Sequence, residues 1–544
     1  MKCIECSQNF DYLSGEKEAY KKQDFPLPLN CNECRQRRRM IFRNERSLYY
    51  NKSSKSGKKI ITIYSEDAPF KIIDQDEWWD DSFDATIYER NFDFTKPFFE
   101  QFKDLQKDVP RWARQHLDCE NAEFTNNCAN VKNSYLDFSC NDCEDIFYCT
   151  KVYYTKNCFD SMWLYNSQYC AECVQSHNCY NTHYSQLCEN CSDSHFLFDC
   201  RDCRNCILCA GARNGEYMVL NKKYSKEEFE NQKKEFLKTL HGDKNKVVKL
   251  FEELKQNVAR KNVHNLSAEA CTGDYISNSR SVFNGFNIIH CEDCVDAYSS
   301  SKLKNCYGAY CSDVGEISID CDTNYDLYNC HFCTYVVGCK NSYWCDQSFY
   351  LNDCFGCVGL KRKKFTILNK EYSEKEYAEM MKKIKEHMIR TGEWGLPSPA
   401  TLTSFAYNET VAQDEYPLTK KEALAQGFRW YEPKEEAKYF GPEYKIPSNM
   451  DEIDKSICDK ILACEVTGKN YKIIPQEFEF YKKFNIPIPR RCPDQRHKDL
   501  LALQNPTKLR DVACLSCGKE IQTTYRESEK AKILCEECYL KKFY

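Results

Sequence analysis

The sequence predicts a mainly β protein with α-helical linkers, in which zinc-ribbon modules at both ends flank a duplicated, cysteine-rich region of β-solenoid-like repeats. Three observations support this fold class. Cysteines recur every 21 residues in the middle of the chain, the middle is itself duplicated, and both ends carry C-x2-C pairs. A fixed period near 20 residues is typical of proteins whose units stack on one another. The 21-residue series is Cys128, Cys149, Cys170 and Cys191.

Composition restricts the class of protein. The chain has 544 residues, 38 cysteines and a formal net charge of −5, so the whole molecule is not suited to general nucleic-acid binding. No run of about 18 apolar residues predicts a membrane span, and no apolar run follows Met1. We therefore expect a cytoplasmic, reducing location, where cysteines bind metal or pack as thiols. Disulfides are the alternative.

Both ends carry the ligand pattern of a zinc ribbon. Two C-x2-C pairs offer Zn²⁺ four thiolates in a tetrahedron, and cysteines that only pack in a core rarely pair twice in this way. We therefore expect about two zinc sites. Their ligands are Cys3, Cys6, Cys31 and Cys34 at one end, and Cys514, Cys517, Cys535 and Cys538 at the other.

The two ends are copies of one two-ribbon module, related by a shift of 461 residues. The copy of the first ribbon has Thr467 and Gln495 in place of two cysteines, and a site of Cys464 and Cys492, completed by Cys458 or His497, is a tentative prediction. In the second N-terminal ribbon all four ligands are replaced, which leaves a poor zinc set. The replacements are Ser53, Ser56, Asp74 and Glu77, and the expected core is Ile60, Ile63, Ile72 and Trp78.

A basic cluster follows the first ribbon. Six arginines stand against one acid, Glu45, between residues 35 and 46. Such a cluster beside a zinc knuckle is suited to phosphate contact, and the alternative is a solvated helix face paired with nearby acids. The tentative nucleic-acid-binding residues are Arg35, Arg37, Arg38, Arg39 and Arg43.

The middle of the chain holds two related blocks. A shift of 148 aligns their cysteines, including Cys158 with Cys306 and Cys173 with Cys321. We expect coils of about 21 residues with three short faces, in which Asn-Cys pairs place Asn at a bend and Cys inside. Cysteine is small and easily buried, so a thiol-packed core is the leading interpretation. The C-x2-C pairs keep open a string of zinc knuckles.

One run in the first block is denser than the rest. Cys200, Cys203, Cys206 and Cys209 are each separated by two residues. The spacing is similar to that of cluster-binding ferredoxins, but Ala210 stands where their pattern continues. An iron–sulfur cluster, a further zinc-like site and simple packing are the three interpretations that the spacing leaves open.

We expect seven segments. Capping boxes at Ser225 with Glu228 and Ser373 with Glu376 predict a helix after each block, and Phe98, Phe102 and Leu105 predict one before the first block. The segments are a two-ribbon module (1–80), an aromatic helical connector (81–118), repeat block 1 (119–224), a helical spacer (225–265), repeat block 2 (266–372), a helix and irregular linker (373–450) and a second two-ribbon module (451–544).

Three runs carry a resemblance to a known family. Residues 464–469, 486–497 and 407–412 resemble a family of cysteine-rich, multi-zinc-ribbon proteins from candidate-phyla bacteria, over essentially the whole chain. Similar sequences sometimes carry a CaiB/BaiF family (CoA-transferase) label. The chain shows no α/β alternation and no defined aspartate nucleophile, so a CoA-transferase role is not supported. Compared with the family pattern, it lacks the cysteines of the second N-terminal site.

Sequence alone favours a zinc-binding, non-enzymatic scaffold that binds an unidentified macromolecule along its repeats. The alternatives are a nucleic-acid-binding protein that uses the arginine cluster and a redox or iron–sulfur protein. The ten histidines are scattered, and the chain contains no Ser–His–Asp or phosphate-loop motif, so we predict no catalytic residue.

Overall fold

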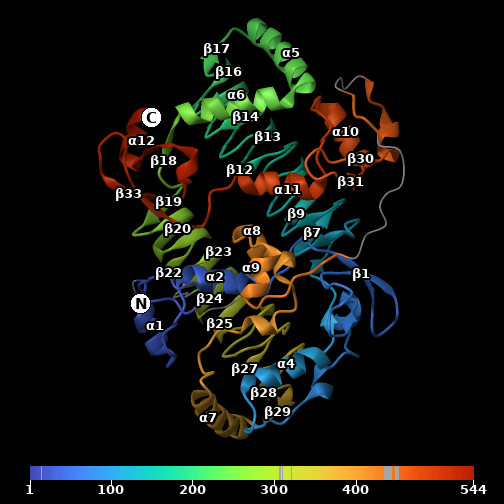
Figure 1. Cartoon of the computed structure of the whole chain (residues 1–544), viewed down its shortest axis with the longest axis vertical. Coiled ribbons are helices and arrows are strands. Elements are labelled where there is room, and N and C mark those ends of the chain that lie inside the picture. The colour runs from blue at the N-terminus through green and yellow to red at the C-terminus, as the bar shows by residue number, and fades with distance from the viewer. Residues whose placement is uncertain (14, 305–307, 309, 320–321, 434–443, 448–451) are drawn as a thin grey trace. The chain divides into compact units, whose positions relative to one another are not determined.

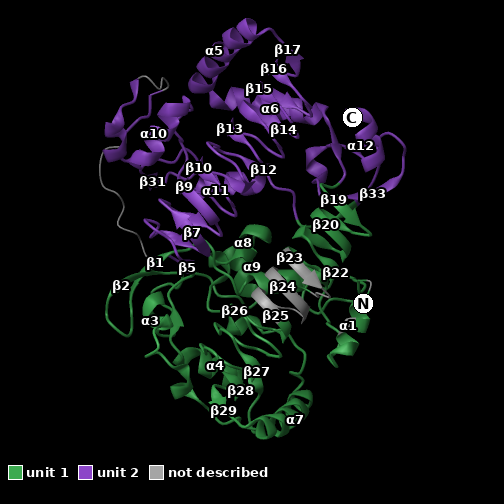
Figure 2. Ribbon diagram, turned by 180° about the vertical axis from the view of Figure 1, so that it is seen from behind, with its two compact units in different colours: residues 1–115, 263–431, 507–510 green, residues 116–262, 432–506, 511–544 purple. Residues whose placement is uncertain are grey.

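The structure is a computed structural model of the whole chain (Figure 1). It describes residues 1–13, 15–304, 308, 310–319, 322–433, 444–447 and 452–544. Cys306 and Cys321, which enter the predicted alignment of the blocks, lie outside these residues. The described chain is mainly strands with some helices, as expected, and it forms two compact units (Figure 2). Unit 1 comprises residues 1–115, 263–431 and 507–510, and unit 2 comprises residues 116–262, 432–506 and 511–544.

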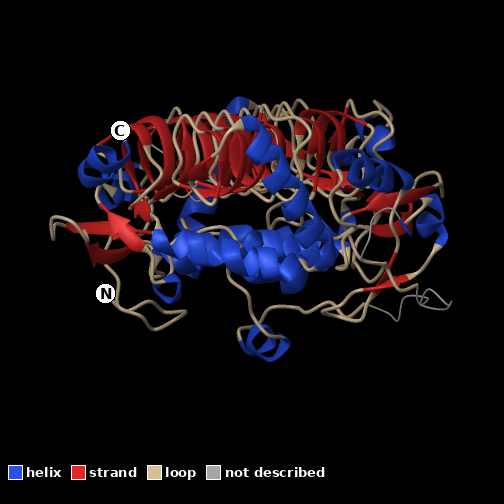
Figure 3. Ribbon diagram, turned by 90° about the horizontal axis from the view of Figure 1, so that it is seen from above, coloured by secondary structure: helices blue, strands red, loops and turns tan. Residues whose placement is uncertain are grey.

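Block 1, in unit 2, is a set of short parallel strands. Each paired residue lies opposite the residue twelve positions later, as in the series Ser192, Arg204 and Glu216. The stacked strands are red in Figure 3. They are β5 (His116–Leu117), β6 (Thr125–Asn126), β7 (Cys128–Lys132), β8 (Asp137–Phe138), β9 (Asn141–Phe147), β10 (Lys156–Phe159), β11 (Met162–Tyr165), β12 (Val174–His177), β13 (Tyr180–His183), β14 (Ser192–Phe198), β15 (Arg204–Ala210), β16 (Glu216–Val219) and the antiparallel β17 (Lys222–Lys223).

Block 2, in unit 1, repeats this arrangement. The same twelve-residue offset holds from β20 onward, for example between Asn352 and Lys364. Its strands are β19 (Leu266–Glu269), β20 (Gly273–Phe283), β21 (Gly285–Ile289), β22 (Glu292–Val295), β23 (Tyr298–Lys304), β24 (Tyr310–Ile319), β25 (Asp322–His331), β26 (Val336–Val337), β27 (Asn352–Phe355), β28 (Lys364–Ile367) and the antiparallel β29 (Lys370–Glu371).

The backbone of block 1 changes direction every three residues. From Asn127 to Leu220 every third residue has a positive φ, and the residue after each of these, as far as Met218, is an inward position. The bends expected at Asn127, Asn157, Asn178 and Asn190 are confirmed, with φ values of 53°, 52°, 53° and 53°. The expected 21-residue coil is corrected: 21 residues are seven three-residue intervals, whereas strands pair after four. Cysteines within block 1 are separated by multiples of three residues, because only every third position faces inward.

The inward cysteines of block 1 lie in one buried cluster together with aliphatic residues such as Val131, Ile146 and Leu164. Cys149 and Cys188 are buried, and burial raises the pKa of both thiols well above its ordinary value. Each inward thiol donates to the carbonyl two residues before it, as from Cys149 Sγ to Phe147 O at 3.5 Å. Most also lie near the carbonyl nine residues ahead, as with Cys149 Sγ and Cys158 O at 3.5 Å. Serine and threonine fill the same role, for example Ser185 Oγ with His183 O.

Helices flank each block at equivalent positions. A shift of 149 places Phe98, Phe102 and Arg111 on Val247, Phe251 and Arg260. The segment before each block thus forms a helix with one buried face, followed by a short strand. These elements are α4 (Phe98–Asp108) and β4 (Arg111–Trp112) in unit 1, and α6 (Lys244–Asn257) and β18 (Ala259–Lys261) in unit 2. The helices that follow the blocks, α5 (Lys226–Gly242) and α7 (Glu374–Thr391), begin with the predicted capping boxes.

The terminal modules complete the units. β4 pairs with β3 and β18 pairs with β34, so each module shares a strand with the segment before a block. The predicted core residues Ile60, Ile63, Ile72 and Trp78 are buried. In unit 1 the remaining elements are α1 (Glu16–Lys22), α2 (Asn32–Met40), β1 (Tyr49–Lys52), β2 (Lys59–Thr62), β3 (Ile72–Ile73), α3 (Gln75–Trp79), α8 (Val411–Glu415) and α9 (Lys420–Ala425). Those of the C-terminal module are β30 (Leu462–Ala463), β31 (Asn470–Tyr471), α10 (Pro475–Phe484), α11 (Pro493–Ala502), β32 (Arg510–Ala513), β33 (Glu520–Thr523), β34 (Lys532–Leu534) and α12 (Glu536–Phe543).

Burial of the inward thiols predicts their reactivity. In the folded, metal-loaded protein a maleimide should label the part-exposed Cys119, Cys271 and Cys458 well before Cys149 or Cys188, because thiolate formation and reagent access both require exposure. Peptide mass spectrometry over a time course measures this order, and unfolding in guanidinium should make all sites react alike. Labelling of Cys149 as fast as Cys119 in the folded state would contradict the packing.

Candidate metal centres

The first predicted ligand set is assembled in unit 1. Cys3 and Cys6 lie on a tight turn, and Cys31 immediately precedes α2, which carries Cys34 in its first turn. The amide of Cys31 donates to Cys3 Sγ at 3.3 Å, and Cys6 Sγ lies 3.7 Å from Cys31 Sγ. All four sulfurs lie within 4.8 Å of one another, which suits four-coordinate binding of one metal ion.

The second set, in unit 2, has the same local geometry. Cys514 and Cys517 lie on the turn between β32 and β33, where Gly518 has a φ of 72°. Cys535 precedes α12 and Cys538 lies in its first turn. The amide of Cys535 donates to Cys514 Sγ at 3.3 Å, and the four sulfurs again lie within 4.8 Å of one another. The chain therefore carries two groups of four cysteines that fit two metal sites.

Backbone amides prepare one thiolate in each group. Burial acts to raise the pKa of Cys3, but hydrogen bonds from the amides of Cys6 and Cys31 lower it to about 6. At Cys514 burial again opposes ionisation, and amides that include those of Cys535 and Cys517 lower the pKa to about 6. A thiolate at neutral pH is the form that binds a metal.

The second N-terminal ribbon keeps the turn but not the ligands. The amide of Ser53 donates to Lys58 O at 2.8 Å, as the amide of Cys514 donates to Lys519 O, also at 2.8 Å. The amide of Asp74 donates to Ser53 Oγ at 3.3 Å, the counterpart of the Cys535–Cys514 bond. Ser53 also donates to Glu77, so the hydroxyl and the carboxylate occupy positions that hold sulfurs in the other ribbon.

This correspondence predicts that the lost site can be rebuilt. Replacing Ser53, Ser56, Asp74 and Glu77 together by cysteine should create a third four-cysteine group, because the backbone that orients the ligands is already present. Metal analysis should then give one more zinc per chain than the natural sequence. The variant with only Ser53 and Ser56 replaced is the control, since two thiols do not make a closed site, and equal zinc in all three proteins would refute the prediction.

The tentative ligands are not gathered into such a group. Among the described residues only the two four-cysteine groups bring three or more His, Cys, Asp or Glu ligand atoms within 4.8 Å of one another. Thr467 Oγ1 lies 3.9 Å from Cys492 Sγ in the altered ribbon, and Cys464 and His497 are buried nearby in the same module. Cys200, Cys203, Cys206 and Cys209 occupy four successive inward positions of block 1.

The arginines of α2, and Arg43 after it, mostly pair with carboxylates inside unit 1. Arg35 pairs with Glu16, Arg39 with Asp296 at 2.7 Å and Arg43 with Glu45 at 2.9 Å, and these arginines are buried. Arg37 and Arg38 both reach Glu5, at 2.5 and 3.0 Å, and their side chains are 14% and 24% exposed. The arrangement favours a structural role for the three buried arginines.

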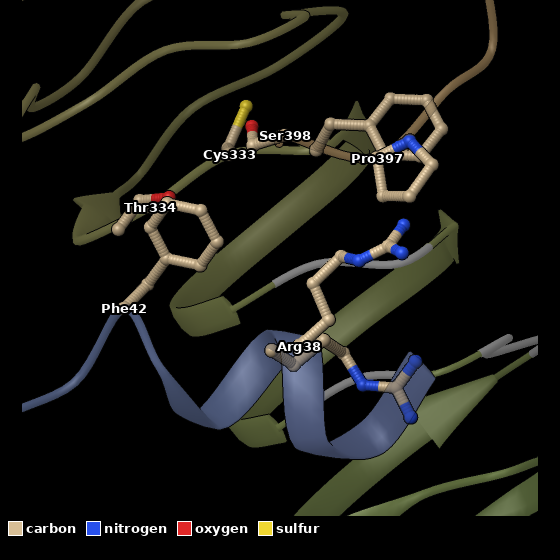
Figure 4. Close-up of a pocket in the computed structure, with 8 residues that line it drawn as sticks. Arg38, Phe42, Cys333, Thr334, Pro397 and Ser398 are labelled. Atoms are coloured by element: carbon tan, nitrogen blue, oxygen red, sulfur yellow. The ribbon is translucent and has the colours of Figure 1, made fainter. Parts of the chain in front are cut away.

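A small cavity lies beside this cluster. It is lined by residues that include Arg38, Phe42, Cys333 and Pro397 (Figure 4). Its volume is about 20 Å³, which holds about one water molecule. It is too small for an organic substrate.

Sequence reasoning missed a buried charge network in unit 2. Arg496 Nη1 donates to Asp160 Oδ2 at 2.5 Å and to Glu477 Oε1 at 2.8 Å, and Tyr481 donates to Asp160 at 2.9 Å. A signal was present, because the 461-residue shift places Glu16, Tyr20 and Arg35 on Glu477, Tyr481 and Arg496. The buried ion pair of Arg35 and Glu16 is therefore repeated in both modules.

No protein-family model matches the chain, and no curated protein is significantly similar to it. None of the helices in the described ranges has the length and apolar character needed to cross a bilayer.

The buried network predicts a pH dependence of stability. Burial raises the pKa of Asp160 to about 7 from 3.8, although Arg496 opposes the shift. A carboxyl whose folded pKa is raised contributes stability below pH 3.8 that is lost as the pH rises through 7. From pH 6 to 8 this loss is about 1.4 kcal/mol. Asp160→Asn should abolish that component, measured as the difference between the urea unfolding curves of variant and natural protein at both pH values.

The matched control is Asp142→Asn, which changes an exposed carboxylate in the same block. It should leave the pH dependence between pH 6 and 8 unchanged. If the Asp160 variant has the same pH dependence as the natural protein, proton uptake by this network does not contribute.

Proposed function

We propose that the protein is a zinc-stabilised, non-enzymatic scaffold whose two β-solenoids present surfaces to a macromolecular partner. The two four-cysteine groups carry this proposal. Thiolate quartets of this spacing and geometry are the ligands that structural Zn²⁺ prefers, and a site with four protein ligands keeps no open position for a substrate. Zn²⁺ at these sites stabilises the fold of the ribbon and performs no chemistry.

The solenoid part of the proposal is supported by the strand pairing. Parallel strands with a constant twelve-residue offset and a three-residue interval between bends are the pattern that successive coils of a narrow four-sided solenoid produce. Stacked coils present long, regular outer surfaces, which suit extended partners. In block 1 this surface includes the exposed aromatic side chains of Tyr154, Tyr165 and Tyr180.

Each terminal module contacts the repeat block of its own unit through buried ion pairs. In unit 2, Asp160 of block 1 shares Arg496 with Glu477 of the C-terminal module, and in unit 1 Arg39 of the first ribbon pairs with Asp296 of block 2. Removing one partner of a buried, hydrogen-bonded ion pair strongly destabilises a fold, because the other charge is left buried and unpaired. Loss of metal from the first ribbon would therefore loosen the contact that Arg39 makes to block 2, whereas the Arg496 network lies in the altered ribbon and does not depend on a metal.

Zinc loading tests the proposal. Protein purified under reducing, chelator-free conditions should contain about two zincs per chain and no iron. Cys34→Ser and Cys514→Ser should each lose about one zinc and lower the thermal midpoint, because metal binding to such sites is part of the folding free energy. Cys143→Ser, which removes a buried thiol of block 1, should retain both zincs. Four or more zincs, or stoichiometric iron, would contradict this assignment.

Nucleic-acid binding remains the second candidate, carried by the part-exposed guanidinium groups of Arg37 and Arg38. The Arg37→Ala, Arg38→Ala double variant spares the buried ion pairs of Arg35, Arg39 and Arg43. A salt-dependent gel shift that this variant loses would favour nucleic acid as the partner, and no binding at low salt would exclude it.

A further inference from the structure

Lysines without an acidic partner gather on the helical hairpin of unit 2, which α5 and α6 form. Between residues 233 and 249 this hairpin holds six lysines and only two acids, although the whole chain has a formal net charge of −5. Lys244 pairs with Glu172 of block 1 at 2.7 Å. The exposed lysines of the hairpin form no ion pair with any described residue, and they are Lys234, Lys238, Lys246 and Lys249. The excess of positive charge is therefore local and available to a partner.

Both helices turn these lysines away from block 1. Phe236 of α5 and Phe251 of α6 contact the same ring of block 1, that of Phe196, at centroid distances of 6.0 and 5.4 Å. Lys234 and Lys238 each lie two residues from Phe236, which places them on the opposite face of α5. The lysines of α6 are likewise exposed. The hairpin thus packs its apolar face on the block and presents its lysines to solvent.

The end of α10 extends this basic surface. His241 Nε2, in the last turn of α5, donates to Asn485 O at 3.0 Å, so α5 and α10 meet at their C-terminal ends (Figure 1). The last turn of α10 carries two more exposed lysines, Lys482 and Lys483. Neither forms an ion pair within the part of the chain that the structure describes. Three helices therefore contribute to one basic surface.

Aromatic rings border the lysines at this end. Lys483 Nζ lies 4.4 Å from the ring centre of Tyr169, a residue of block 1. The Tyr169 ring lies 5.5 Å from that of Tyr180 and 5.3 Å from that of Phe484. The side chain of Tyr180 is 49% exposed, and Tyr169 and Phe484 are half-buried. We call the six exposed lysines of α5, α6 and α10, together with these three rings, the lysine–aromatic surface.

We propose that the lysine–aromatic surface binds single-stranded nucleic acid. Unpaired ammonium groups bind phosphates, and aromatic rings beside them stack on unpaired bases, which is the combination found in proteins that bind single strands without sequence preference. A duplex keeps its bases stacked, and anionic lipid headgroups offer no base, so neither uses the rings in this way. The proposal rests on the proposed function, because it names the macromolecular partner of the scaffold and one surface that binds it.

Fluorescence anisotropy tests the proposal with the zinc-loaded full chain and a labelled oligouridylate of about 20 nucleotides, which exceeds the usual single-strand site. We expect salt-dependent binding. Replacing Lys234, Lys238, Lys482 and Lys483 by alanine should lower the slope of log K against log salt by about 3, because each phosphate contact contributes about 0.7. Tyr180→Ala should weaken binding about tenfold without changing this slope, and Tyr180→Phe, which keeps the ring, should bind as the natural chain does.

The matched control removes the same charge from the C-terminal ribbon, by alanine at the exposed Lys519, Lys530, Lys541 and Lys542. It should keep the natural salt slope, and circular dichroism verifies that each variant is folded. Three outcomes would overturn the proposal. They are no oligouridylate binding at low salt, an equal loss in the control variant, and an equal loss in the Arg37→Ala, Arg38→Ala variant, which would assign the binding to the first ribbon.

Two further measurements separate the remaining explanations. Vesicles of phosphatidylcholine and phosphatidylserine should bind less tightly than the oligouridylate, and binding to vesicles alone would assign the lysines to a membrane surface and reject the proposal. Zinc is measured in every sample. Two zincs per chain without oligouridylate binding would reject this surface and leave the zinc-stabilised scaffold intact, so the two failures are distinct.

Discussion

The rest of block 1 depends on a left-handed backbone bend at every third residue. Such a bend costs about 1–2 kcal/mol for a residue with a side chain, and Asn and Asp tolerate it best. Of the 32 bend positions from Asn127 to Leu220, 16 are Asn or Asp. Asparagine side chains also bond along the stack, as from Asn190 to Asp202 at 3.0 Å. The bends leave a narrow interior, and no inward residue from Cys128 to Met218 is aromatic or basic.

This constraint explains what the sequence could and could not predict. Asn-Cys pairs identified bends and inward positions, because both roles depend on one residue and its neighbour. The twelve-residue offset between paired strands was not predicted. Cys, Ser, Thr and Val all fit at inward positions, so cysteine spacing alone does not show after how many three-residue intervals the chain returns to the same face. The two four-cysteine groups were predictable because their cysteines and turns are local in the sequence. The partner of Arg39 was not, since Asp296 lies 257 residues away.

The four ribbon segments share a similar turn, which is stabilised in two different ways. Binding of Zn²⁺ to a structural site is worth about 10–16 kcal/mol, whereas a hydrogen bond contributes about 1 kcal/mol. The bond from Ser53 to Glu77 cannot replace a metal, and that ribbon is instead held by the burial of Ile60, Ile63 and Trp78. The ribbon around Cys464 and Cys492 is held by Tyr481 and by the charges around Arg496. A ribbon can therefore lack metal-binding cysteines where buried side chains stabilise its turn instead.

Backbone polarity sorts the cysteines into two chemical states. The inward thiols of Cys149 and Cys188 donate to backbone carbonyls, and burial raises the pKa of both, so they keep their protons. The ribbon turns face amide groups, so Cys3 and Cys514 accept and ionise near neutral pH. One residue type therefore serves as a neutral packing group in the blocks and forms groups of four that fit a metal ion in the ribbons.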